Sequence, residues 1–165
     1  MDDDSQVYQW RLQGRLHVWQ YLPRVRGLEG WHLNADTPAC TSMADLVDRM
    51  LRAGEKTHKR IPVSVPPHML VGQGQPWKPV AELLLRYPYG EVEEDFWQMG
   101  LGEGDVLTLT VGSARLREFS ESLLGLPHWK DDFALGPQAS GDRRARQDAE
   151  RRFANECLWF WTKVE

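Results

Sequence analysis

The chain has 165 residues, of which 41% are hydrophobic and 27% are charged, and its formal net charge is −4. These values are typical of a globular protein, exclude an intrinsically disordered chain, and give no general electrostatic affinity for nucleic acid. A chain of this length buries most of the surface that its unfolded form exposes, so we expect one domain spanning residues 1–165.

The N-terminal residues and the cysteines favour a cytoplasmic location, which we therefore expect. Residues 1–5 are acidic, whereas a secretory signal begins with basic and then apolar residues. No apolar run approaches the ~20 residues of a membrane span, so we expect no membrane association. Cys40 and Cys157 are the two cysteines and lie too far apart in sequence to suggest a disulfide framework. Fifteen arginines against five lysines suggest a bacterial source.

In the first part of the chain, the pattern predicts three strands and one helix. Residues 6–22 are expected to form two extended segments broken near Gly14, and residues 31–35 a short strand. A helix is expected to start near Ser42, which matches a capping box with Asp45. Gly54 should end that helix, which would bury Met43, Leu46, Val47, Met50 and Leu51.

Apolar and polar residues alternate in three segments in the middle of the chain, which predicts strands at 60–67, 80–87 and 105–112. The first contains prolines, which cannot donate to a ladder of hydrogen bonds, so it should form a sheet edge. Residues 72–79 are expected to form a loop because two glycines and two prolines fall there.

In the last third, a second helix should begin at Ser113 and end at Gly125, with Leu116, Phe119, Leu123 and Leu124 on one face. Residues 131–136 are expected to form a short strand, and 142–156 a helix with a thin apolar stripe. Without a regular strand–helix–strand rhythm, the order favours an α+β fold, a mostly antiparallel sheet with two or three helices.

The chain ends in the sequence CLWFWTKVE, which has apolar residues on both faces of an extended strand. A strand with two apolar faces is normally covered on both sides, so we expect it in the interior of the sheet. Alternatively, one of its faces belongs to an open, ligand-binding aromatic surface that includes a titratable group. The residues of this alternative site are His17, Trp19, Tyr21, Trp159 and Trp161.

No residue cluster matches a catalytic or metal-binding pattern, and we expect no cofactor, no metal and no catalytic residue. The residue types of a nucleophile, a base and an orienting group occur close together at His32, Asp36 and Cys40. Their spacing does not match that of a thiol enzyme. Cys40 is expected to be a packed small residue, although a nearby helix start would stabilise its thiolate. Acidic residues interleave with the arginines between 143 and 152, which argues against nucleic-acid binding there.

The segment from Glu91 to Asp105 holds six acidic residues and no basic residue. Such a segment favours a basic protein partner through electrostatic steering, and an aromatic residue within it would supply an apolar anchor. The alternative is a solvated loop with its aromatic residues in the core. The predicted partner-binding residues are Glu91, Glu93, Glu94, Asp95, Phe96 and Trp97.

Two functions from different classes follow. The first is a non-catalytic protein-interaction module, such as an adaptor, a chaperone-like protein or an immunity-type inhibitor, acting on another protein. The second is a protein, or a modest enzyme, that binds a small molecule on the aromatic surface. The sequence leaves the oligomeric state open.

Overall fold

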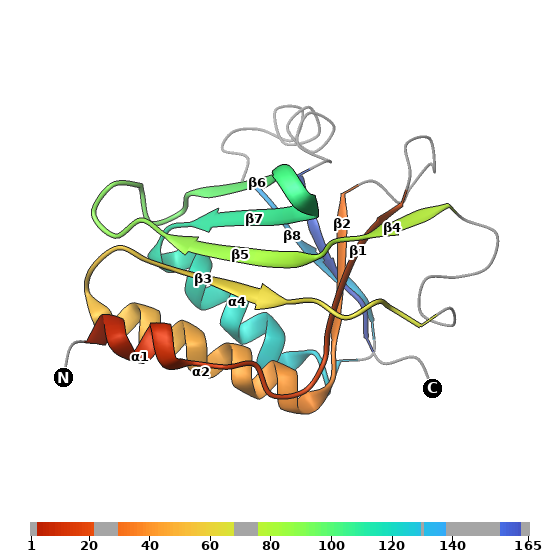
Figure 1. Cartoon of the computed structure of the whole chain (residues 1–165), viewed down its shortest axis with the longest axis horizontal. Helices are drawn as coiled ribbons and strands as arrows, with labels where there is room; N and C mark the ends of the chain where they lie inside the picture. Colours follow the sequence, from red (N-terminus) through yellow and green to blue (C-terminus); the bar gives the residue numbers. More distant parts are fainter. Residues whose placement is uncertain (1–2, 22–29, 68–75, 130, 138–155, 163–165) are drawn as a thin grey trace.

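The computed structural model describes residues 3–21, 30–67, 76–129, 131–137 and 156–162. Within these residues the fold is α+β, with three α-helices and nine strands in two mixed sheets (Figure 1). The helices are α1 (Asp3–Gln9), α2 (Thr37–Ala53) and α4 (Ser113–Gly125), and η1 (Glu103–Asp105) is a 3-10 turn. The strands are β1 (Leu16–Tyr21), β2 (Trp31–Ala35), β3 (Thr57–Pro62), β4 (Trp77–Pro79), β5 (Glu82–Tyr87), β6 (Trp97–Leu101), β7 (Val106–Val111), β8 (Phe133–Leu135) and β9 (Leu158–Phe160).

Sheet A has the strand order β4-β1-β2-β9-β8, and sheet B the order β3-β5-β7-β6. Most neighbours are antiparallel, whereas β2 with β9 and β5 with β7 are parallel. The predicted α+β class with mostly antiparallel strands is confirmed. The sequence did not predict the division into two sheets, whose strands run in clearly different directions in Figure 1.

The chain passes from one sheet to the other between β4 and β5. The Val80 N–H donates to the carbonyl of Val18 in sheet A at 3.1 Å. The next N–H, of Ala81, donates to the carbonyl of Asp105 at 2.9 Å, beside sheet B. Backbone hydrogen bonds therefore continue through the junction and fix how the two sheets meet.

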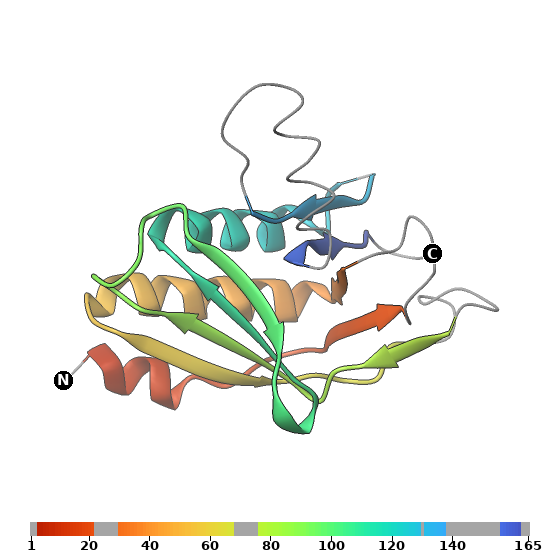
Figure 2. The same ribbon diagram turned by 90° about the horizontal axis from the view of Figure 1, so that it is seen from above.

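One apolar core joins both sheets to α2 and α4. Figure 2 shows the two helices side by side, with sheet B along one side of them. Leu83, Leu85, Leu107 and Leu109 line sheet B and are fully buried. The core also contains buried side chains of sheet A and the helices, among them Leu16, Val18, Leu33, Met43, Leu46, Leu116, Phe119, Leu158 and Phe160.

The expectation of an extended segment at 6–13 was wrong, because the helix α1 extends to Gln9. Val7 and Trp10 lie three residues apart and are both buried, which is a helical spacing. The Trp10 indole donates to the carbonyl of Ser42 at 2.9 Å and so ties this segment to α2.

Helix α2 ends at Gly54 as predicted, since Gly54 adopts the left-handed conformation. Its predicted start was wrong: the cap is Asp36, whose carboxylate accepts from the Ala39 N–H at 2.9 Å. Ser42 instead lies buried inside the helix, where its hydroxyl accepts from the Gln13 N–H at 3.0 Å. Pro38 in the first turn was the signal for the earlier start.

Other predicted boundaries differ by a few residues. The predicted edge strand is β3, which lies at an edge of sheet B, but it begins at Thr57 and ends at Pro62. Residues 77–79, expected in a loop, form β4. The predicted helix at 142–156 falls almost entirely outside the described residues, and so do the arginines at 143–152.

The C-terminal strand β9 lies inside sheet A, between β2 and β8, as predicted. Leu158 and Phe160 point into the core and are fully buried. Trp159 pairs in register with His32 of β2, and its neighbours therefore face the opposite side of the sheet. The aromatic residues near the chain end thus cover both faces of an interior strand.

Candidate functional site

The turn between β5 and β6 carries most of the predicted partner-binding residues. We call Glu91–Asp95 the acidic turn. It lies at one end of sheet B, next to the start of α4 (Figure 1). The Glu91 N–H donates to the carbonyl of Pro88 at 3.0 Å, and the Phe96 N–H to that of Glu93 at 3.1 Å. These two bonds define the turn locally.

The first turn of α4 fixes the backbone of the acidic turn in place. The carbonyl of Glu94 accepts from the N–H groups of Ala114 and Arg115, at 3.0 and 3.3 Å. Helix N-termini leave such N–H groups without intrahelical partners, so Glu94 acts as a backbone cap. Gly112 permits this approach, because a Cβ there would overlap the Glu93 carbonyl oxygen. The turn is therefore held by hydrogen bonds and by close packing.

Negative charge on the acidic turn is mostly unpaired. The side chains of Glu91, Glu93, Glu94 and Asp95 are all exposed. Glu91 forms an ion pair with Lys56. No ion pair is found for the other three carboxylates within the part of the chain that the structure describes. The turn therefore presents a compact negative surface to solvent.

A pocket of about 290 Å³ opens between the acidic turn and the start of α4. Tyr87 and Tyr89 form part of its wall and meet edge to face, with ring centroids 6.1 Å apart. Tyr87 is buried, whereas Tyr89 is 49% exposed. We call this cavity the tyrosine pocket; it is lined by Tyr87, Pro88, Tyr89, Gly90, Val92, Glu94, Gly112 and Ser113.

The electrostatics of the tyrosine pocket can be traced through Tyr87. Burial raises the pKa of its hydroxyl, and the positive charge of Arg117 opposes part of that rise. The carboxylate of Glu94 acts on the same hydroxyl in the raising direction. The charge of Tyr89 and a hydrogen bond with Ser113 also act on this pKa, in opposite directions, and Glu94 contributes least.

The two aromatic residues that follow the acidic turn do not form an exposed anchor. Trp97 is 7% exposed and belongs to the core, and Phe96 is half-buried. The Trp97 indole donates to the carbonyl of Glu156 at 2.7 Å, and the Arg115 guanidinium lies 5.0 Å from its ring centroid. Tyr89 is the exposed aromatic residue beside the carboxylates, and it was not among the residues predicted from the sequence.

The alternative aromatic surface is brought together on one face of sheet A. Strand register places Trp19 opposite His32, and His32 opposite Trp159. Trp161 contacts this group, with its ring centroid 6.0 Å from that of Trp19. All five predicted residues of this surface therefore share a face, together with His32, on the side away from the core.

The rings of this face pack tightly against one another. The His32 ring stacks on Trp19 at 5.6 Å, and its Nδ1 accepts from the Trp161 indole at 2.7 Å. Trp19 and His32 are 0% and 1% exposed, so neither ring is open to solvent. Burial raises the pKa of the Tyr21 hydroxyl, and the neighbouring Trp19 indole opposes that rise. Sequence alone did not select His32 for this face because strand order was unknown.

The remaining candidates for catalysis do not converge. Cys40 is 1% exposed, and burial, followed by the negative charge of Asp36, raises the pKa of its thiol to about 11. The expected packed cysteine is confirmed, and the thiolate stabilisation suggested by a nearby helix start is wrong. His32 lies in the aromatic face and Asp36 caps α2, so no nucleophile–base pair forms. Among the described residues, no cluster of three or more metal-ligating side chains occurs.

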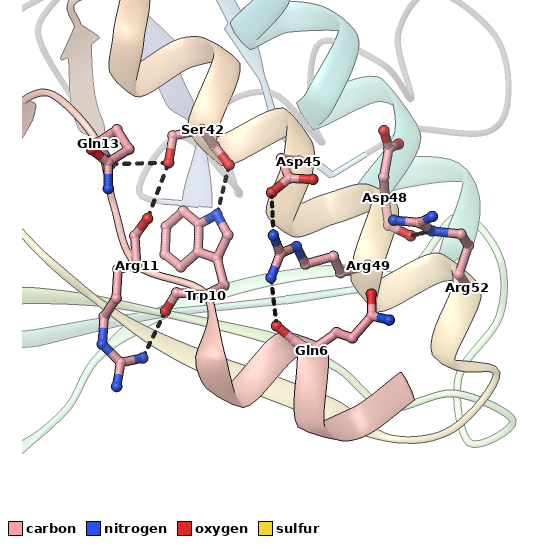
Figure 3. A network of polar contacts seen from close by, with 9 residues as sticks. All are labelled: Gln6, Trp10, Arg11, Gln13, Ser42, Asp45, Asp48, Arg49 and Arg52. Atoms are coloured by element: carbon pink, nitrogen blue, oxygen red, sulfur yellow. Dashed lines mark hydrogen bonds and ion pairs between the residues drawn. The ribbon is translucent and has the colours of Figure 1, made fainter. Parts of the chain in front are cut away.

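A larger groove, of about 760 Å³, lies between the segment after α1 and the start of α2. Figure 3 shows the polar contacts between residues of these two segments. No pattern in the sequence indicated this groove. Arg49 forms an ion pair with Asp45 at 3.0 Å and donates to the carbonyl of Gln6 at 2.9 Å. The Trp10 indole donates to Ser42, as described above. Ser42, Asp45 and Arg49 in this groove therefore already have polar partners within the protein.

Comparison with known proteins finds no matching family model, no similar curated protein and no similar solved structure. None of the described helices is long and apolar enough to cross a membrane.

Proposed function

We propose that the chain is a non-catalytic protein-interaction module that binds a basic partner through the acidic turn. The observation that carries the proposal is the set of three exposed carboxylates at Glu93, Glu94 and Asp95, which form no ion pair with any described residue. They stand on a backbone that α4 and Gly112 hold in place. A surface that is already ordered loses less conformational entropy on binding than a flexible loop would.

Charge complementarity would direct the encounter with the partner. Exposed carboxylates at an interface rim raise the association rate and make it sensitive to salt, rather than supplying most of the affinity. Tyr89, the exposed aromatic residue next to the carboxylates, would supply apolar contact area. An adaptor or an immunity-type inhibitor in the cytoplasm of a bacterium fits this proposal, and the two free cysteines support that compartment.

The test is a comparison of two variants with equal changes in net charge. The first neutralises the three unpaired carboxylates through Glu93→Gln, Glu94→Gln and Asp95→Asn. The control neutralises three exposed carboxylates elsewhere, through Glu103→Gln, Glu121→Gln and Asp131→Asn. A polypeptide that co-purifies with the wild-type chain is identified by mass spectrometry, purified, and titrated against each protein.

The turn variant should bind the purified partner roughly tenfold more weakly in low-salt buffer, and the control should bind like the wild type. The difference should shrink as salt is added. Equal loss of binding in both variants, or no loss in either, would overturn the proposal.

A second candidate function is binding of a small molecule at the aromatic face of sheet A. The specific observation in its favour is that strand register and ring contacts gather Trp19, Tyr21, His32 and Trp161 on one face of sheet A. Native mass spectrometry of the chain recovered from its source cells tests this candidate. A bound mass that is lost in the Trp161→Ala variant would favour it over the first, and a chain without such a mass would count against it.

A further inference from the structure

The tyrosine pocket lies beside the acidic turn and combines three properties. Its aromatic wall is formed by Tyr87 and Tyr89, which meet edge to face. Its lining includes the apolar residues Pro88 and Val92 and the acidic residue Glu94, whose charge acts on the Tyr87 hydroxyl. Aromatic ring faces attract cations, and the attraction strengthens where water is partly excluded. This combination suits a positively charged head on an apolar stem.

The volume of the pocket restricts what can enter it. At about 290 Å³, it falls at the lower limit of pockets that hold drug-sized ligands, which span roughly 300–1,000 Å³. It can hold one long side chain. Lysine and arginine bury their methylene stems along apolar surface while keeping the charged group near polar partners. Pro88 and Val92 would contact the stem, and Tyr89 and Glu94 the head.

An anion is disfavoured at this place, although α4 begins there. Helix N-termini bind anions through free N–H groups. Here the N–H groups of Ala114 and Arg115 already donate to the Glu94 carbonyl, so these two donors of the first turn are not free to bind an anion. Arg117 is a nearby positive charge, but the three unpaired carboxylates of the acidic turn outnumber it.

We propose that the tyrosine pocket binds a single lysine or arginine side chain of the basic partner and so fixes the partner's position on the acidic turn. This inference rests on the proposed function. It adds a side-chain-sized binding site, whereas the acidic turn alone would bind any dense positive charge.

Two synthetic peptides of equal length and charge test the inference. One alternates serine with lysine. The other alternates serine with diaminopropionic acid, whose amine stands on a shorter stem that cannot reach into the pocket. Both are titrated against the wild-type protein and the Tyr89→Leu variant in mildly acidic, low-salt buffer, with calorimetry as the readout. Tyr89 is half exposed, so the variant should fold.

The lysine peptide should bind the wild type about two- to fivefold more tightly than the short-stem peptide, and this preference should vanish in the Tyr89→Leu variant. Glu94→Gln should weaken the lysine peptide more than Glu103→Gln does, although both remove one charge. Glu103 is a suitable control because it lies at the opposite end of the β6–β7 hairpin.

Equal affinity of the wild type for both peptides would overturn the pocket inference and leave binding to the acidic turn intact. No binding of either peptide to the wild type would overturn both the inference and the proposed function. The two failures are therefore distinguishable.

Discussion

Replacing Gly112 with alanine tests whether close packing holds the acidic turn in place. A Cβ at this position would overlap the Glu93 carbonyl oxygen and lie 2.6 Å from that of Glu94. Both are backbone atoms, so the turn itself must move. The backbone of Gly112 is extended, with φ at −79°, which alanine adopts without strain, so any effect comes from the contact.

Overpacking of this kind typically costs ~1–3 kcal/mol. Displacing Glu94 would also weaken its hydrogen bonds to the first turn of α4, each worth ~0.5–1.5 kcal/mol. We therefore expect Gly112→Ala to lower the free energy of unfolding in urea by ~2 kcal/mol and to weaken binding of the serine–lysine peptide.

Gly100→Ala is the matched control for this experiment. Gly100 lies in the neighbouring strand β6, and a Cβ there would meet nothing within 4 Å. The control should change the free energy of unfolding by less than ~0.5 kcal/mol and leave peptide binding unchanged. If Gly112→Ala were as stable as Gly100→Ala and bound the peptide equally well, the described fixation of the turn would be wrong.

Four further predictions concern the rest of the fold. Phe160→Ala should lower the free energy of unfolding by ~3–5 kcal/mol, because Phe160 is fully buried in the interior strand; a loss below ~1 kcal/mol in urea denaturation would contradict that placement. Trp161→Phe should cost ~1–3 kcal/mol in the same assay, since it removes the indole N–H that donates to Nδ1 of His32, and an unchanged midpoint would count against this hydrogen bond. Cys40 should resist alkylation in the folded protein, and Cys157 should react faster. Mass spectrometry of samples taken at timed intervals measures both rates. Similar rates would refute the raised pKa of Cys40. The folded state holds the Cys40 proton more tightly than the unfolded chain does. The free energy of unfolding should therefore include the full contribution of this thiol below the ordinary thiol pKa. That contribution should decline as the pH rises toward about 11.

Local sequence patterns predicted those helices and strands whose apolar residues recur at a regular spacing. The alternation of β1 and β7 and the left-handed glycine at Gly54 were readable because each reflects a local steric or burial requirement. The interior position of the C-terminal strand followed from its two apolar faces. These features do not depend on which distant segment packs against them.

The errors arose where tertiary contacts decide between local alternatives. Helix α1 is short, and burial of Trp10 against α2 selects the helical spacing over the extended one. Strand β6 was hidden in an acidic segment, although Trp97 and Met99 alternate with exposed residues. The parallel pairing of β2 with β9 joins residues far apart in sequence, which no local pattern specifies.

The candidate site was predictable in part. Four acidic residues in a turn-rich segment indicated an exposed negative surface, and their carboxylates are exposed. The role expected for Trp97 depended on its orientation, which is set by hydrogen bonding to Glu156. Tyr87 ends β5, but Tyr89 lies in the turn that follows, where the alternation of a strand no longer applies, so the contact between the two rings was not predictable from their spacing.

Mapping the backbone amide signals of the protein by NMR during titration with the serine–lysine peptide tests the central claim most directly. We expect saturable shifts confined to residues 87–95 and 112–113, which line the acidic turn and the tyrosine pocket, and expect them to weaken with added salt. Shifts centred on β1, β2 and β9, or spread evenly over the exposed carboxylates, would contradict the account.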